Sequence, residues 1–239
     1  MTKTIETIID SFFPSRCPSC GGPSGVSAYA PFCEDCWRGI LPWDGPCCEI
    51  CREPLDSEYA VRCSPCLEDP PEYKRAFVFG LFDGTLKEAV HCYKFASAGR
   101  GLSAPLAGLL ASTGLPPADV ITAVPLSKKR LLERGFNQSM LLAKHLARLS
   151  GAKLFPHALV KKKDTPPQAG LTRKERASNL RGVFESAAGE KTRTLEGMTV
   201  LLVDDVITTG VTARECSKAL AGAGASVVYV AALARTKKE

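Results

Sequence analysis

The sequence predicts an α/β protein in which a parallel sheet, flanked by helices, follows a small cysteine-rich domain. Two observations support this class. From Arg75 onward, near-continuous apolar segments alternate with helical patterns, which is typical of a parallel sheet covered on both faces. Before that point, nine of the eleven cysteines lie between Cys17 and Cys66. Such clustering predicts a separate domain that depends on its thiols.

The length and composition fit this organisation. With 239 residues, 45% of them hydrophobic, the chain can form one medium domain and one small one. Pro70 and Pro71 interrupt regular structure where the cysteines cease to cluster. We therefore expect a cysteine-rich domain of residues 1–70 and an α/β domain of residues 71–239. The net charge of +6 favours acidic partners such as phosphates without naming one.

Eight cysteines of the first domain form four CxxC pairs, separated by twelve, eleven and eleven residues. Zinc prefers a tetrahedron of thiolates, and this spacing lets one tight turn present both sulfurs to a metal. The simplest arrangement joins the first pair to the second and the third to the fourth, although the spacing also allows an interleaved arrangement. Cys47 is interpreted as a bystander. The pairs predict two structural zinc sites with the ligands Cys17, Cys20, Cys33, Cys36, Cys48, Cys51, Cys63 and Cys66.

Disulfide bonds are the alternative to zinc, and the cellular compartment decides between them. The first residues carry Glu6 and Asp10 and lack the apolar core of a signal peptide. No apolar run reaches the roughly 18 residues that a membrane span needs. We therefore expect a cytoplasmic protein, and in that reducing compartment clustered thiols more often bind metal. Because closed four-cysteine sites are structural, we interpret the first domain as an interaction module for DNA, a partner protein or the following domain.

The second domain is predicted element by element from its periodicity. RAFVFGLF, DVITAV, TVLLVD and SVVYVAAL predict strands at 75–82, 119–124, 199–204 and 226–233. The segments between them predict helices at 85–95, 102–112, 137–150 and 212–222. GAGAS, from Gly222, is expected to end the last helix before the final strand. In parallel sheets, ligands bind just beyond the carboxyl ends of the strands.

One strand is expected to bring acids to that edge. VLLVDD ends at Asp204 and Asp205, and Thr212 with Glu215 fits a capping box that should begin a helix there. The intervening loop would combine free N–H groups, a helix dipole and hydroxyls, which suit a phosphate. The acids would accept hydrogen bonds from a sugar diol. Neither a P-loop nor a G-x-G-x-x-G motif is present, so the ligand implied is a ribose 5-phosphate.

The residues also carry a resemblance to known proteins. VLLVDDVITTGVT resembles the phosphoribosyl pyrophosphate (PRPP) signature of type I phosphoribosyltransferases. AVPLSKKRLLERGFNQSMLLAKHLA, KDTPPQAGLTRKERASNLRGVF and the four CxxC pairs together resemble the ComF competence-protein family. Over nearly the whole chain, this resemblance implies a type I phosphoribosyltransferase-like parallel sheet flanked by helices, with an N-terminal double zinc ribbon.

The resemblance further implies roles for individual residues. Asp204 and Asp205 would bind the ribose hydroxyls as the catalytic pair, and the following loop would hold the 5-phosphate. The segment PLSKKR would bind pyrophosphate, and Mg²⁺ would bridge pyrophosphate oxygens and ribose hydroxyls with few protein ligands. The PRPP-binding residues implied beyond the acids are Thr208, Thr209, Gly210, Thr212, Lys128, Lys129, Arg130, Arg134 and Arg173.

Positive charge is concentrated between Lys128 and Arg181, where fourteen Lys or Arg residues face three acids. A groove for single-stranded DNA and an ordinary solvated surface are two interpretations, and charge density does not choose between them. Few aromatic residues interleave here, which disfavours base stacking. At RGFNQ, a helix start capped by Asn137 is as well supported as ligand contact by Arg134 or Asn137. A third interpretation is a lid over PRPP formed by Gln168, Arg173, Arg176, Asn179 and Arg181.

Three functions follow from these observations. The first is a ComF-like, Mg²⁺- and PRPP-binding phosphoribosyltransferase that handles incoming single-stranded DNA during natural transformation. The second is a non-catalytic module of the same fold that senses PRPP or holds DNA and a partner such as a DNA-translocation motor. The third is a salvage enzyme acting on a free nucleobase, although no segment after Thr212 offers a clear base pocket. The acceptor is not predicted by the sequence.

Overall fold

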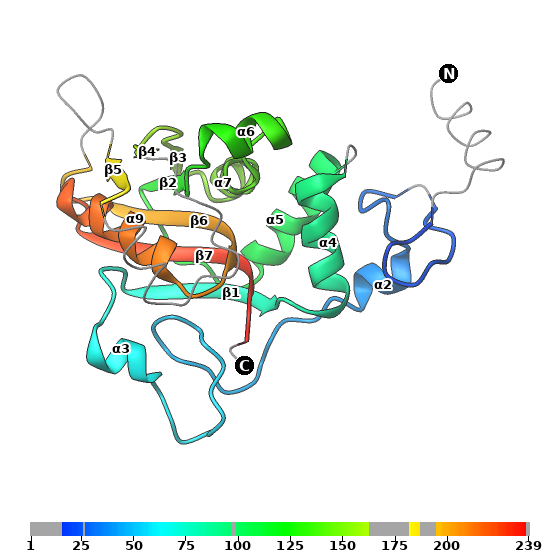
Figure 1. Cartoon of the computed structure of the whole chain (residues 1–239), viewed down its shortest axis with the longest axis horizontal. Coiled ribbons are helices and arrows are strands. Elements are labelled where there is room, and N and C mark those ends of the chain that lie inside the picture. The colour runs from blue at the N-terminus through cyan, green and yellow to red at the C-terminus, as the bar shows by residue number, and fades with distance from the viewer. Residues whose placement is uncertain (1–15, 26, 97–98, 163–181, 187–194, 238–239) are drawn as a thin grey trace.

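The computed structural model is organised around a parallel sheet of five strands in the order β1-β7-β6-β2-β3 (Figure 1). The strands are β1 (Arg75–Leu81), β2 (Val120–Ala123), β3 (Lys153–Leu154), β6 (Thr199–Ile207) and β7 (Val227–Arg235). A separate antiparallel pair joins β4 (Leu159–Lys161) to β5 (Phe184–Ser186). The structure describes residues 16–25, 27–96, 99–162, 182–186 and 195–237.

Helices connect and cover these strands. Those of the α/β part are α4 (Gly84–Phe95), α5 (Ser103–Ala111), α6 (Lys128–Arg134), α7 (Gln138–Ser150) and α9 (Val211–Gly222), with a 3₁₀ turn η1 (Gly99–Leu102) before α5. In its described residues, the cysteine-rich part has two short helices, α2 (Glu34–Arg38) and α3 (Ser64–Glu68). In the part of the chain that the structure describes, no helix combines the length and the apolar composition that crossing a membrane requires.

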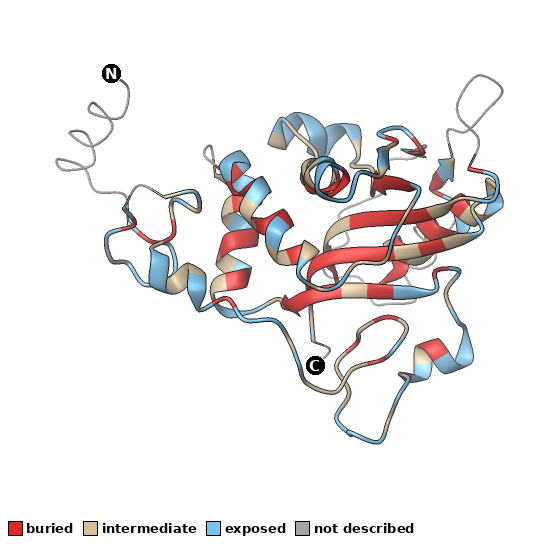
Figure 2. Cartoon of the chain, turned by 180° about the vertical axis from the view of Figure 1, so that it is seen from behind, coloured by how far each residue is buried: buried red, intermediate tan, exposed pale blue. Residues whose placement is uncertain are grey.

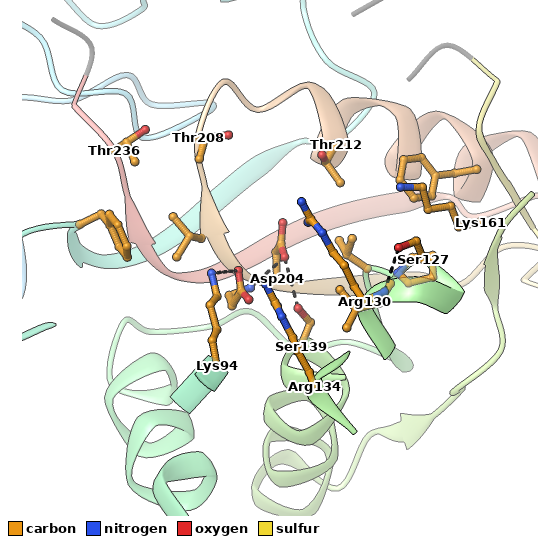
Figure 3. A pocket seen from close by; sticks show the side chains of 17 residues that line it. Lys94, Ser127, Arg130, Arg134, Ser139, Lys161, Asp204, Thr208, Thr212 and Thr236 are labelled. Carbon is orange, nitrogen blue, oxygen red and sulfur yellow. Dashed lines mark hydrogen bonds and ion pairs between the residues drawn. The ribbon is translucent and has the colours of Figure 1, made fainter. Parts of the chain in front are cut away.

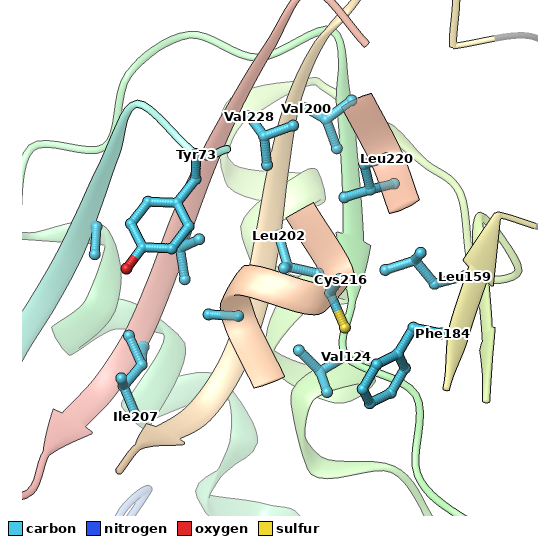
Figure 4. Packing of buried hydrophobic residues seen from close by; sticks show 14 of the residues in the cluster. Tyr73, Val124, Leu159, Phe184, Val200, Leu202, Ile207, Cys216, Leu220 and Val228 are labelled. Atoms are coloured by element: carbon cyan, nitrogen blue, oxygen red, sulfur yellow. The ribbon is translucent and has the colours of Figure 1, made fainter. Parts of the chain in front are cut away.

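The sheet separates two hydrophobic cores, because successive residues of a strand face opposite sides. Along β6, Leu201 and Val203 face the core formed with α4, α5 and α7. Val200 and Leu202 face the other core, which α9 and the β4–β5 pair cover (Figure 4). The central strands are therefore buried on both faces (Figure 2). The near-continuous apolar runs of the sequence reflect this double coverage.

The edge of the sheet at β1 is protected by the segment that joins the two cysteine clusters and by the first turn of the second cluster. The Trp43 amide donates to the Phe79 carbonyl at 2.8 Å, and the Ala76 amide donates to the Ile50 carbonyl at 2.6 Å. An uncovered edge strand offers unpaired backbone groups to other chains. The cysteine-rich part therefore completes the sheet as well as preceding it in the sequence.

The observed elements confirm the predicted strands and helices of the α/β part, with ends that differ by a few residues. The predicted capping box is wrong. Gly210, at φ +78°, occupies the N-cap position, α9 begins at Val211, and no side chain caps it. The Glu215 carboxylate instead accepts a hydrogen bond from the Gly182 amide at 3.1 Å. The Glu215 carboxylate, which a capping box would use locally, thus binds a backbone amide that is distant in the sequence.

Candidate functional site

A pocket of about 370 Å³ opens at the carboxyl ends of the parallel strands (Figure 3). Its walls come from the ends of β1, β2 and β6, from α4, α6, α7 and the start of α9, and from the β4–β5 pair. This is where a parallel α/β sheet places its ligands. The polar residues that line it are Lys94, Ser127, Arg130, Arg134, Ser139, Lys161, Asp204, Asp205, Thr208, Thr212 and Thr236.

The two adjacent acids lie on β6 and have different partners. Asp204 Oδ1 accepts hydrogen bonds from the Ser139 hydroxyl at 3.2 Å and from the Asp205 amide at 2.9 Å. Asp205 Oδ1 lies 3.0 Å from Lys94 Nζ, and both of these side chains are mostly buried. Lys94 therefore neutralises Asp205, which allows two carboxylates to stand side by side in one pocket.

The environment of Asp204 also changes its acidity. Burial and the neighbouring charge of Asp205 raise the pKa of Asp204 to about 7, against the opposing effects of the Asp205 amide, Lys94 and Ser139. A carboxyl group with this pKa exchanges its proton near neutral pH. It can therefore donate a hydrogen bond when protonated and accept hydrogen bonds from a diol when ionised.

The loop between β6 and α9 forms the wall of the pocket next to these acids. Thr208 and Thr212 line the pocket. Gly210 adopts a left-handed conformation, at φ +78°, that turns the chain from the strand into the helix, and only glycine adopts it without strain. Thr209 and Gly210 are not among the lining residues. The loop thus presents two hydroxyls at the N-terminus of a helix of three turns, where anions are stabilised.

The opposite wall is basic. The segment PLSKKR does not remain a loop: the Ser127 hydroxyl caps α6 by accepting from the Arg130 amide at 3.3 Å. Arg130 and Arg134 are one helical turn apart and both line the pocket, whereas the exposed Lys128 and Lys129 do not. A helical spacing of four residues explains this division. The structure therefore selects two of the four predicted cations on α6.

Arg134 is held in place by two neighbours. Its Nη1 donates to Gln138 Oε1 at 3.1 Å, its guanidinium lies 5.0 Å from the centre of the Phe95 ring, and burial lowers its pKa. Asn137 caps α7, because its side-chain oxygen accepts from the Met140 amide at 3.2 Å. The helix-cap interpretation of RGFNQ is therefore confirmed for Asn137. Arg134 lines the pocket, and its contact with a ligand stays a prediction.

Sequence reasoning missed several residues of the pocket. Lys94 lies in the last turn of α4, Ser139 in the first turn of α7, and Lys161 on β4. Each lies far along the chain from the acids, and no local motif identified them. Arg173 and the predicted lid residues lie outside the described residues.

The eight paired cysteines form two clusters, and the structure settles their pairing. Cys17, Cys20, Cys33 and Cys36 form one cluster, and Cys48, Cys51, Cys63 and Cys66 form the other, with the sulfurs of each cluster within 4.8 Å of one another. This is the simplest arrangement predicted, and Cys47 belongs to neither cluster. A tetrahedral zinc–thiolate site with Zn–S distances of about 2.3 Å places its sulfurs about 3.8 Å apart.

The measured sulfur separations fit this geometry. Cys20 and Cys33 are 3.7 Å apart in the first cluster, and Cys51 and Cys63 are 3.5 Å apart in the second. Four thiols converging on one point without a bond between them have the composition and spacing of a closed structural zinc site. The two clusters therefore fit two structural zinc ions.

Comparison with known proteins supplies the family. The chain is 32% identical over 231 residues to "DNA utilization protein YhgH" of Salmonella typhi, covering 93% of this chain and 98% of that protein. It is 31% identical over 233 residues to "Competence protein F" of Haemophilus influenzae, covering 94% and 99%. The chain belongs to the ComF family. A further member, "Competence protein ComFC" of Bacillus subtilis, is 28% identical over 79% of this chain and 77% of its own length.

Two family models divide this ComF chain. Residues 8–67 match the double zinc ribbon domain, and residues 132–239 match the phosphoribosyl transferase domain. The fold is therefore a phosphoribosyltransferase-like parallel sheet with an N-terminal double zinc ribbon, as predicted. We call residues 16–40 the first ribbon and residues 46–69 the second ribbon below.

Solved structures of similar shape include two enzymes. One is a glutamine PRPP amidotransferase from B. subtilis in complex with ADP and GMP (24% identity, TM-score 0.41), and the other is described as the allosteric regulatory enzyme of purine biosynthesis (25% identity, TM-score 0.42). The alignments cover 59% and 60% of the ComF chain but only 30% of either enzyme.

Proposed function

We propose that this ComF protein binds PRPP together with Mg²⁺ in the pocket at the carboxyl edge of its sheet. The observation that carries the proposal is the convergence of three groups in one pocket: the paired acids, the hydroxyls at the start of α9, and the cations of α6. PRPP carries a diol, a 5-phosphate and a pyrophosphate. Each of these groups has a counterpart of matching chemistry.

The arrangement of these counterparts assigns the ligand an orientation. The diol donates to Asp204 and Asp205, which are hydrogen-bond acceptors when ionised. The 5-phosphate lies against Thr208 and Thr212, where the N-terminus of α9 adds a positive dipole. The pyrophosphate lies toward Arg130 and Arg134 on α6, whose fork-shaped donors suit phosphate oxygens. We retain Lys128, Lys129, Thr209 and Gly210 as candidates at the borders of this site.

Magnesium fits the chemistry of this pocket. Hard oxygen donors are present in the carboxylates of Asp204 and Asp205 and the hydroxyl of Thr208, and magnesium is commonly bound by one or two carboxylates with substrate phosphates and water. When bound, the ion would supply charge neutralisation for the leaving pyrophosphate. Lys94 already lies at Asp205. We infer that Lys94 and the metal together neutralise the negative charge of the two carboxylates.

The same geometry suits phosphoribosyl transfer. Transfer breaks the bond between the anomeric carbon and a pyrophosphate oxygen and forms one from that carbon to a nucleophilic acceptor, which gives up its proton. Such a reaction passes through an oxocarbenium-like transition state. It asks mainly for positioning and for stabilisation of the leaving group. Arg130 and Arg134 supply the fixed cations, and Asp204 and Asp205 hold the ribose.

The names of its relatives extend the proposal to DNA. A competence protein and a DNA utilization protein cover nearly this whole chain. We propose that the protein acts in the cytoplasm on incoming single-stranded DNA during natural transformation, with a translocation motor as a candidate partner. The basic surface of α6, which exposes Lys128 and Lys129 beside the pocket, offers phosphate contacts for such a strand.

Calorimetric titration of PRPP with Mg²⁺ tests the central proposal. Wild-type protein is expected to bind with a stoichiometry near one, and Asp204→Asn with Asp205→Asn is expected to abolish binding. Asp56→Asn, which alters an exposed acid of the second ribbon, is the matched control and should leave binding unchanged. Absence of binding to the wild-type protein would refute the proposal.

Two further assays separate the alternatives. Release of pyrophosphate in the presence of a nucleobase identifies a salvage enzyme, and release that depends on DNA identifies transfer to DNA. PRPP binding without release identifies a sensor. Oligonucleotide binding that weakens steeply with salt, and persists in Asp204→Asn with Asp205→Asn, favours a non-catalytic DNA-binding module.

A further inference from the structure

The second ribbon lies directly behind the loop that we assign to the 5-phosphate. Its four cysteines belong to the same hydrophobic core as Ile207, Val211 and Ala213, which flank that loop. All four are buried. The predicted boundary between residues 70 and 71 therefore marks a change in amino-acid composition, but the second ribbon and the α/β domain share one hydrophobic core. The second ribbon is placed to influence the pocket.

A first connection runs from the turn that carries Cys48 and Cys51. The Cys48 amide donates to the Glu53 carbonyl at 2.8 Å, and the Glu53 amide hydrogen-bonds the Cys51 sulfur. The backbone of Glu53 is thus fixed by the metal-binding turn. Its carboxylate accepts from Nε of Arg235 at 3.0 Å and also forms an ion pair with Nη2 of that arginine.

This ion pair is deeply buried and points at the phosphate loop. The side chains of Arg235 and Glu53 are 3% and 5% exposed. Nη1 of Arg235 is buried and has no hydrogen-bond partner among the described residues. A Cβ added at Gly210 would lie 3.9 Å from that atom. Arg235 therefore presents an uncommitted donor to the back of the turn that leads into α9.

A second connection runs from the turn that carries Cys63 and Cys66. Arg214 lies in the first turn of α9, and its amide donates to the Gly210 carbonyl at 3.0 Å. Its guanidinium donates to the Pro65 carbonyl at 3.1 Å and the Asp69 carbonyl at 2.6 Å, and Nη2 lies 3.9 Å from Cys66 Sγ. The second ribbon thus binds two arginines: Arg214, which belongs to the first turn of α9, and Arg235, whose Nη1 lies behind Gly210.

We propose that Arg235 and Arg214 are positioning residues through which the second ribbon fixes the phosphate loop, so that the second cysteine cluster sets the affinity of the pocket for a sugar phosphate. This inference rests on the proposed function for the identity of the ligand. The physical reason is preorganisation: a loop held in its bound conformation loses less conformational freedom when the anion binds. Releasing either arginine lets the loop sample other conformations.

Among the residues that the structure describes, the first ribbon has no comparable connection to the phosphate loop, and it supplies the control. Its contact with α4 includes a hydrogen bond between the exposed Ser19 and Thr85 hydroxyls at 2.8 Å. Its own ion pair, Glu34 with Arg38, is solvent-exposed and joins residues of one short helix. Glu34→Gln therefore removes the same charge as Glu53→Gln, from a ribbon that does not reach the phosphate loop.

The test compares Glu53→Gln, Arg214→Gln and Glu34→Gln in the full-length protein. Zinc content should remain two per chain in all three. Affinity for ribose 5-phosphate, measured by calorimetry, is expected to fall about tenfold in Glu53→Gln and in Arg214→Gln, as for the loss of one charge-assisted hydrogen bond. Glu34→Gln should bind as the wild type does.

Amide hydrogen exchange provides a second measurement that needs no ligand. The amides of residues 208–213 are expected to exchange about tenfold faster in Glu53→Gln and Arg214→Gln, whereas those of α5 and α7, on the opposite face of the sheet, should not change. A change confined to the loop distinguishes positioning from general destabilisation. Glu34→Gln should leave both regions as in the wild type.

Each outcome decides the inference. Wild-type exchange and affinity in a folded Glu53→Gln variant with two zinc ions would overturn it. If Glu53→Gln does not fold, Arg214→Gln carries the same test, because the Arg214 side chain is 17% exposed and tolerates change better. If the wild-type protein binds neither ribose 5-phosphate nor PRPP with Mg²⁺, the proposed function fails, and loop exchange alone decides the role of the second ribbon.

Discussion

The two ribbons have nearly the same cysteine spacing but different surroundings. Of the four paired cysteines of the first ribbon, only Cys17 is buried, and Cys20 is exposed. All four cysteines of the second ribbon are buried. The first packs at the side of α4, where Cys17 joins the core beneath that helix. The second lies under β7 and α9 and is tied to both by buried or half-buried arginines.

The difference shows that one sequence motif can serve two structural purposes. A structural zinc site stabilises the part of the chain that folds around it, because the free energy of metal binding contributes to the free energy of folding. In the first ribbon that energy holds a small unit whose buried side chains join the core beside α4. In the second it also supports the wall behind the pocket. The first ribbon is therefore the freer of the two to contact a partner, and the second is part of the site.

Removal of each zinc site is the strongest test of this comparison. Cys48→Ser with Cys51→Ser is expected to prevent folding of the whole chain, because a structural zinc contributes about 10–16 kcal/mol in zinc-finger peptides, against a total stability of about 5–15 kcal/mol. Cys17→Ser with Cys20→Ser should leave the sheet folded. Zinc content and thermal unfolding followed by circular dichroism measure both effects. Equal loss of structure in the two variants would contradict the comparison.

The ion pairs of the two ribbons should differ next most strongly. Arg235→Met leaves the Glu53 carboxylate buried without its partner, and we expect a loss of about 3–5 kcal/mol in the free energy of unfolding. Adding Glu53→Met should restore most of it, since an apolar pair of similar volume often replaces a buried ion pair without cost. Denaturant unfolding gives these values.

The matched change in the first ribbon is Arg38→Met. Its ion pair with Glu34 is solvent-exposed, so we expect a change within about 0.5 kcal/mol. A loss in Arg38→Met as large as in Arg235→Met would show that exposure does not distinguish the two ribbons.

The titration of Asp204 probes whether the pocket depends on the first ribbon. The pKa of Asp204 is raised to about 7 in the folded protein and is about 3.9 in an unfolded chain. The folded state therefore binds more protons between these values, and stability falls as pH rises toward 7, with a slope of up to about 1.4 kcal/mol per pH unit. Asp204→Asn should remove this slope and raise stability at pH 8.

Urea unfolding between pH 6 and pH 8 measures this slope as the difference between the wild type and Asp204→Asn. The same difference is expected when both proteins also carry Cys17→Ser and Cys20→Ser, because the partners of the acids within the described part of the chain do not come from the first ribbon. A changed difference would show that the first ribbon reaches the pocket after all.

Much of the fold was predictable because its signals are local. The apolar runs of β6 and β7 and the periodicity of α7 each lie within about a dozen residues, and the structure reproduces them. The pairing of neighbouring CxxC turns was also predicted, since short connections favour it. The start of α9 was not, because Glu215 takes a distant backbone partner, Gly182, in place of a local one.

The pocket was predictable only where a motif marked it. Asp204, Asp205 and the threonines follow one strand and were identified together. Lys94 and Ser139 reach the acids from helices far along the chain, and such contacts follow from the packing of the whole sheet. The role of Arg235 was hidden for the same reason. From the sequence, a charged residue near the end of the last strand is expected to be solvent-exposed. Arg235 is instead buried, because it pairs with Glu53, 182 residues away.

The smallest expected effect concerns the contact between the first ribbon and α4. Thr85→Ala removes the exposed hydrogen bond between the Ser19 and Thr85 hydroxyls. Water replaces that bond in either partner, so we expect a change within about 0.5 kcal/mol and a melting temperature close to that of the wild type. Differential scanning calorimetry of Thr85→Ala, Ser19→Ala and the double variant measures the coupling between them. A coupling well above that value would mean that the first ribbon is anchored to the sheet domain as firmly as the second, and the contrast between the two ribbons would then lie in the arginines alone.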